Sequence, residues 1–149
     1  MRRKNIWKST PERGSSTDLS LLEGCSILDL PVSKWEQNML FSAAKDKWLL
    51  QQTGGAFPAA LRKDKSTHPI FVLQKLGNMG CRICPCTSRP NRGGRYIVQG
   101  CRLEITGRST DRDSYILEQF SFNLPLNPAF KPKLPLMGKV PQTCIRDKT

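Results

Sequence analysis

The chain has 149 residues and a formal net charge of +12 at pH 7, because 24 Lys and Arg residues outnumber 12 Asp and Glu residues. This length is typical of one domain, and a hydrophobic fraction of 38% is too high for a wholly disordered chain. The composition excludes a collagen or a coiled coil, and no apolar run approaches the ~18 residues of a membrane-spanning helix. The basic excess favours a polyanionic partner, most simply a nucleic acid, or else only keeps the domain soluble.

Residues 1–18 mix basic side chains with Ser, Thr, Pro and Gly, which predicts a flexible basic tail before a single domain at 19–149. The basic start is not followed by the apolar segment of a secretion signal, so we expect a cytoplasmic protein with no membrane partner. The six cysteines would then be thiols in a reducing compartment. Their even number also allows the alternative of a disulfide framework.

The first part of the domain predicts a strand and then a helix. Cys25–Leu30 is typical of a short strand, and the proline after it ends the strand. A helix is predicted over about 33–53, because Ser33 and Glu36 form a capping box, apolar residues recur at helical spacing, and two glycines follow. A basic loop completes this helical and loop insertion, which covers residues 31–67.

Four further strands are expected, at Ile70–Gln74, Cys81–Thr87, Arg95–Cys101 and Ser114–Phe122, because turn residues separate these apolar runs. Five prolines after residue 122 exclude a long helix there and indicate a proline-rich C-terminal tail. Short strands with one helix predict a mainly β fold, a small open β-barrel with one inserted helix.

His68 is the only histidine in the chain and stands between the basic loop and the apolar strand that begins at Ile70. Loops at the mouth of a rigid scaffold often carry functional residues, and histidine is suited to move a proton near neutral pH. The alternative is an ordinary surface histidine before a proline.

The cysteines Cys81, Cys84 and Cys86 could bind zinc together with Cys101 or Cys144. However, in a strand Cys84 and Cys86 would share one face and Cys81 would lie on the other, and no second C-x2-C pair exists. A cysteine nucleophile has no supporting signature. We therefore expect buried thiols, no metal and no cofactor.

Three segments, in this order, resemble the MazF/PemK family of toxin endoribonucleases: His68–Gln74 (HPIFVLQ), Cys81–Arg89 (CRICPCTSR) and Asp111–Phe120 (DRDSYILEQF). The match covers residues 68–122. The resemblance implies an SH3-like β-barrel, a homodimer with an RNA-binding groove, and an acidic antitoxin protein as partner.

The resemblance also implies metal-independent cleavage of single-stranded RNA by attack of the 2′-hydroxyl on the adjacent phosphorus. Thr87 matches the functional threonine of the family, whereas His68 stands where the family has an arginine. We expect His68 to transfer the proton, Thr87 to donate a hydrogen bond to the phosphate, and Arg89 to stabilise charge. The alternative is an inactive barrel of the same fold that binds nucleic acid or a partner protein. Residues expected to contact RNA are Arg62, Lys63, Lys65, Arg82, Arg92 and Arg95.

Overall fold

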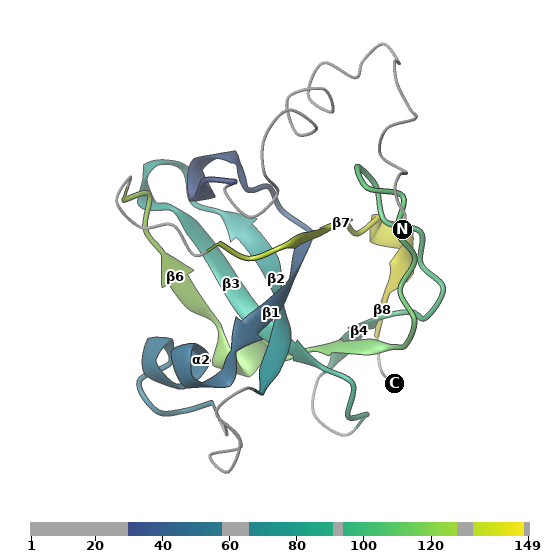
Figure 1. Cartoon of the computed structure of the whole chain (residues 1–149), viewed down its shortest axis with the longest axis horizontal. Helices are drawn as coiled ribbons and strands as arrows, with labels where there is room; N and C mark the ends of the chain where they lie inside the picture. The colour runs from purple at the N-terminus through teal and green to yellow at the C-terminus, as the bar shows by residue number, and fades with distance from the viewer. Residues whose placement is uncertain (1–29, 58–65, 91–93, 128–132, 148–149) are drawn as a thin grey trace.

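The computed structural model describes residues 30–57, 66–90, 94–127 and 133–147 (Figure 1). Over these residues the chain forms eight strands and one α-helix, and the strands make one curled sheet. The predicted fold class, a mainly β small barrel with one helix, is confirmed. The predicted tail at 1–18 lies outside the described residues, as does the predicted strand Cys25–Leu30 except for its last residue.

All strand pairs are antiparallel, and the order across the sheet is β7-β1-β2-β3-β5-β4-β8, with β6 also paired to β3. The strands are β1 (Met39–Lys45), β2 (Thr67–Lys75), β3 (Cys81–Thr87), β4 (Arg95–Ile97), β5 (Ser114–Ile116), β6 (Phe122–Leu124), β7 (Leu136–Lys139) and β8 (Ile145–Asp147). The helix α2 (Asp46–Gln52) follows β1 directly. Short 3-10 turns are η4 (Val32–Lys34), η5 (Gly77–Met79), η6 (Glu118–Phe120) and η7 (Gln142–Cys144).

The sheet curls at β3, because one edge of this strand pairs with two different strands, β6 and β5. Its first three residues pair with β6 and its last two pair with β5. Pro85, which has no N–H to donate, lies between these two paired stretches. Figure 1 shows β1, β2, β3 and β6 on one side of the molecule, β4 and β8 on the other, and β7 passing across. Paired backbone bonds between Glu104 and Lys139 join β7 to the loop after β4.

The central strands β1, β2 and β3 are buried on both faces. Phe41, Ile70 and Ile83 belong to one hydrophobic core, whereas Phe71 and Cys84 belong to a second. Strands buried on both faces have continuous apolar sequences rather than alternating ones, as these strands do. Each fully buried large apolar side chain stabilises the fold by about 1.5–3 kcal/mol, so the two cores fix these three strands firmly.

The predicted helix over 33–53 is wrong over most of its length. Residues 39–45 form β1, and the α-helix within the predicted range is limited to Asp46–Gln52. The two edges of β1 pair with β2 and β7, and its consecutive residues Leu40 and Phe41 enter different cores. This tertiary pairing outweighs the helical spacing of the sequence. No described helix combines the length and apolar character needed to cross a bilayer.

Other boundaries also differ from the prediction. β3 has the predicted bounds and β2 is longer, but β4 ends at Ile97 and Ser114–Phe122 is divided by η6. The predicted proline-rich tail contributes β7 and β8, because its prolines stand beside these strands rather than inside them: Pro135 precedes β7, and Pro141 follows it.

Candidate functional site

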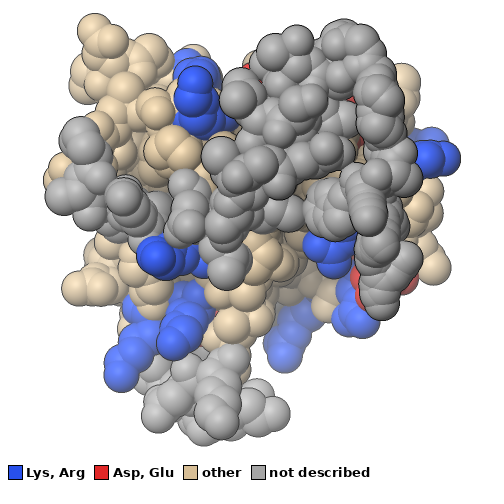
Figure 2. All heavy atoms as spheres, turned by 45° about the horizontal axis from the view of Figure 1, so that its top comes forward, with Lys and Arg blue, Asp and Glu red and all other residues tan. Residues whose placement is uncertain are grey.

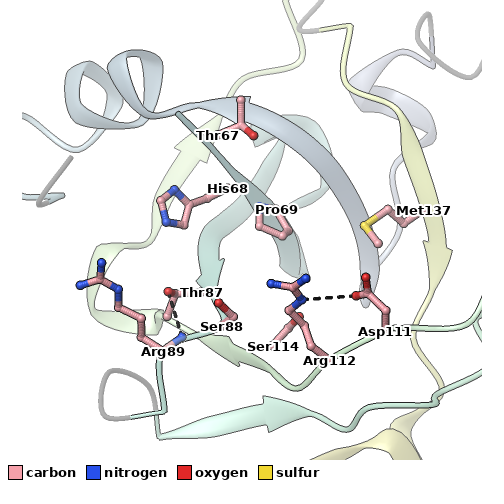
Figure 3. A pocket seen from close by; sticks show the side chains of 10 residues that line it. All are labelled: Thr67, His68, Pro69, Thr87, Ser88, Arg89, Asp111, Arg112, Ser114 and Met137. Carbon is pink, nitrogen blue, oxygen red and sulfur yellow. Dashed lines mark hydrogen bonds and ion pairs between the residues drawn. The ribbon is translucent and has the colours of Figure 1, made fainter. Parts of the chain in front are cut away.

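A pocket of about 360 Å³ opens where β2 begins and β3 ends. One side of its lining is formed by His68, Thr87 and Arg89, which are the three residues predicted to be catalytic. The other side includes Asp111 and Arg112, which precede β5 (Figure 3). Residues from segments far apart in the sequence therefore meet in one concave site.

The ring of His68 is held by Asp46. The pairing of β1 with β2 places Ala44 opposite His68, and Asp46 follows two residues later, in the first turn of α2. The Nδ1 atom of His68 lies 2.5 Å from the Oδ1 atom of Asp46. The ring of Phe57 packs edge-on against the imidazole, with 5.2 Å between centroids. These contacts fix the orientation of the imidazole.

The pairing with Asp46 decides which nitrogen of His68 can react. An Nδ1–H that donates to the carboxylate leaves Nε2 as the nitrogen that can accept a proton from a ligand. The His68 side chain is 29% exposed, whereas that of Asp46 is 4% exposed. The arrangement is a buried carboxylate behind an accessible imidazole, which is suited to general base chemistry.

The second carboxylate oxygen of Asp46, Oδ2, is buried and has no hydrogen-bond partner among the described residues. A buried carboxylate is costly unless it is compensated. The compensation visible here comes from His68, so a positive charge that develops on the imidazole is stabilised by Asp46. The two residues therefore act as one unit.

Thr87 is the last residue of β3 and is 7% exposed. Its Oγ1 accepts the backbone N–H of Arg89 at 3.3 Å, which leaves its own O–H available to donate. The register that pairs Ile70 with Pro85, extended by two residues, brings His68 opposite Thr87. Figure 3 shows these side chains on the same side of the pocket, with Arg89 beside them.

Two guanidinium groups stand at the pocket. The Arg89 residue is exposed, and Arg112 lies 3.6 Å from the carboxylate of Asp111 in an exposed, weak pair. Guanidinium groups bind phosphate through paired hydrogen bonds. On the face drawn in Figure 2, Lys and Arg side chains are much more visible than acidic ones, consistent with the net charge of +12.

Of the residues predicted to contact RNA, the structure describes two, Arg82 and Arg95, and these two lie away from this pocket. Arg82 lies near the opposite end of β3, where its guanidinium bonds the side chains of Ser121 and Asn123. Arg95 pairs with Glu118 at 2.7 Å. Neither arginine lines the pocket. The remaining predicted residues, Arg62, Lys63, Lys65 and Arg92, lie outside the described part of the chain.

The three free cysteines in the described part of the chain, all in β3, are buried. As the strand pattern predicts, Cys81 lies in one core, and Cys84 and Cys86 lie in the other. Burial raises the pKa of all three thiols, which keeps them protonated and unreactive. Across the described residues, no three His, Cys, Asp or Glu side chains are grouped to hold a metal ion.

The expectation of six thiols is wrong for two of them. Cys101 and Cys144 form a disulfide, with 6.0 Å between their Cα atoms. The backbone N–H of Val98 donates to the carbonyl of Cys144, and this contact brings η7 beside the segment that follows β4. A disulfide was the alternative that the even cysteine count left open.

Sequence reasoning missed Asp46. It lies 22 residues before His68, inside the segment predicted to be helix. No sequence pattern therefore indicated that the two side chains are in contact. A strand at 39–45 paired with one at 67–75 would have placed them together. Comparison with protein-family models, with curated proteins and with solved structures gave no match.

Proposed function

We propose that the protein is a metal-independent endoribonuclease that cleaves single-stranded RNA, as its resemblance to the MazF/PemK toxins suggests. The observation that carries the proposal is one pocket lined by His68, Thr87 and Arg89, with the imidazole held by buried Asp46. An imidazole can supply the proton transfer that phosphodiester transesterification needs, and a hydroxyl and a guanidinium can stabilise the charge on the phosphoryl oxygens.

In the proposed reaction, Nε2 of His68 accepts the proton of a ribose 2′-hydroxyl, and the 2′ oxygen forms a bond to the adjacent phosphorus. The bond from phosphorus to the 5′ oxygen breaks, and the imidazolium returns the proton to that oxygen. The products are a 2′,3′-cyclic phosphate and a 5′-hydroxyl. The hydroxyl of Thr87 and the guanidinium of Arg89 bind the phosphoryl oxygens, on which charge builds up.

Asp46 is a positioning residue in this scheme. Its carboxylate does not reach the pocket lining, but it binds Nδ1 of His68 and thereby keeps Nε2 ready to accept a proton. It also stabilises the imidazolium that forms during the step. Histidine therefore supplies a proton acceptor where the family has an arginine.

The test is cleavage of a single-stranded RNA oligonucleotide in EDTA, with mass spectrometry of the products. We expect a cyclic phosphate end, no cleavage of the all-2′-deoxy oligonucleotide, and a loss of about 10²–10⁴-fold in rate for His68→Ala. The Arg89→Ala variant should cleave RNA more slowly than the Arg82→Ala variant, which also loses one positive charge but at a position outside the pocket. Undiminished cleavage by His68→Ala would remove this residue from the mechanism.

The partner expectations remain part of the proposal. The net charge of +12 supports an acidic protein partner, and the resemblance suggests an antitoxin, a homodimer and a cytoplasmic location. The Cys101–Cys144 disulfide is unusual for a reducing compartment. Mass spectrometry after alkylation of freshly lysed cells tests the location: a fully oxidised pair would contradict the cytoplasm.

A second candidate function is a non-cutting barrel that binds nucleic acid or a partner protein. The replacement of the family arginine by His68 favours it, because an imidazole cannot supply a permanent charge and a two-pronged grip. Binding of RNA without cleavage over the pH range in which the protein stays folded would select this candidate.

A further inference from the structure

A row of side chains leads from the pocket across the second half of the sheet. Thr87 of β3 is paired with Tyr115 of β5, Tyr115 with Tyr96 of β4, and Tyr96 with Arg146 of β8. Directly paired residues in antiparallel strands project from the same face of a sheet. The row therefore begins at a residue that lines the pocket and ends at an exposed arginine.

The two tyrosines of this row are the only tyrosines in the chain, and the fold brings their rings together. The ring centroids are 5.1 Å apart and the ring planes differ by 32°. Both residues are half-buried. Their strand neighbours Ile97 and Ile116 project from the opposite face into the second hydrophobic core. The tyrosine rings thus lie on the face that the second core does not use.

We propose that Tyr115, Tyr96 and Arg146, called here the tyrosine row, bind the unpaired bases of RNA next to the phosphate held in the pocket. The inference rests on the proposed function in taking RNA as the ligand. Neighbouring strands are about 4.8 Å apart, so Tyr115 and Tyr96 stand about 5 and 10 Å from Thr87 along the sheet. The nucleotides adjoining the reacting phosphate can reach these positions.

The chemistry of the row fits a single strand. Aromatic rings bind unpaired bases by stacking, with little dependence on base identity. The guanidinium of Arg146 can bind a phosphate or stack on a base, and Arg89 supplies a second positive charge at the pocket end of the row. A duplex keeps its bases stacked on one another, so the row selects single-stranded RNA.

The experiment measures binding separately from cleavage. A fluorescent 2′-O-methyl RNA oligonucleotide has no free 2′-hydroxyl, so its affinity can be measured by anisotropy without being cut. We expect Tyr96→Ala to weaken binding about tenfold or more, Tyr96→Phe to bind like the wild type, and Arg146→Gln to lower the salt dependence of binding. Met79→Ala, which removes an exposed apolar side chain on η5, is the control and should bind normally.

A second measurement needs no variant. In the wild-type protein, 2′-O-methyl RNA carrying 4-thiouridine should photocrosslink to the peptides that contain Tyr96 or Tyr115. Crosslinks confined to other peptides, or equal affinities of Tyr96→Ala and the wild type, would refute the proposal that the tyrosine row binds RNA. If binding depends on Tyr96 but the protein cuts no RNA, the proposed nuclease is refuted and the RNA-binding role of the tyrosine row is retained.

Discussion

Asp46→Asn is the sharpest test of the proposed mechanism. The change keeps the size of a nearly fully buried side chain and removes its charge. The Oδ1 atom of Asp46 lies 2.5 Å from Nδ1 of His68. An asparagine amide that donates to Nδ1 would place the ring proton on Nε2, which is the wrong nitrogen for a general base. The variant therefore keeps the imidazole in place and removes its proton acceptor.

The expected loss follows from the contribution of general base catalysis, which is about 10²–10⁴-fold. At about 1.4 kcal/mol for each tenfold change in rate, this corresponds to about 3–5 kcal/mol of the activation free energy. The cost to folding is smaller. A charge-assisted hydrogen bond of about 1.5–3 kcal/mol is weakened, but the buried charge on Asp46 is removed at the same time. We expect the variant to fold.

The assay is steady-state RNA cleavage in EDTA, in which kcat should fall while KM stays unchanged. Because His68 is the only histidine, its ¹⁵N NMR signals are unambiguous and should show a different tautomer in the variant. Glu36→Gln, which neutralises an exposed carboxylate near the other end of β1, should cut like the wild type. If Asp46→Asn cleaves RNA at a rate within about threefold of the wild type, the positioning role is refuted. A threefold loss is much smaller than the loss expected when a general base is removed.

Three further outcomes are expected. Thr87→Val should lower kcat by about 10²-fold, whereas Thr87→Ser, which keeps the hydroxyl, should retain most of the wild-type kcat. A kcat of the valine variant close to that of the wild type would exclude a role for the hydroxyl. Cys101→Ser opens a disulfide that links residues 43 apart, so it should lower the free energy of unfolding by about 4 kcal/mol in urea titrations; equal stability would show that the bond does not form. Burial raises the pKa of the three free thiols of β3, so iodoacetamide at pH 8 should label them only after unfolding, and rapid labelling of the folded protein would contradict their burial.

The sequence predicted the structure best where the residue types and the turn signals on either side both indicate a strand. The run at Ile70–Gln74 and the segment Cys81–Thr87 have strand-forming residues bounded by turn signals, and both are strands in the structure. The ends of these strands hold His68 and Thr87, so half of the pocket could be anticipated. The other half, near Arg112, depends on how the sheet curls, which no local pattern encodes.

The strand β1 was predicted to be helix, and the reason is physical. Residues 39–45 contain good helix formers at helical spacing, and a bulge interrupts their alternation, with Ala43 at a φ of 65°. Only pairing with β2 and β7, from distant parts of the sequence, makes this segment a strand. Asp46 was hidden by the same error, because its partnership with His68 exists only in the register of β1 and β2.

The divided edge of β3 also bears on ligand size. His68 belongs to β2, whereas Ser114 begins β5, and both line the pocket. The two groups of strands that carry them meet along β3, where Pro85 separates the residues bonded to β6 from those bonded to β5. A small change of twist at this branch point would alter the aperture between the two groups while each keeps its own packing. Substitutions of Pro85 are therefore a means of changing the size of ligand that the pocket admits, without changing any residue that lines the pocket.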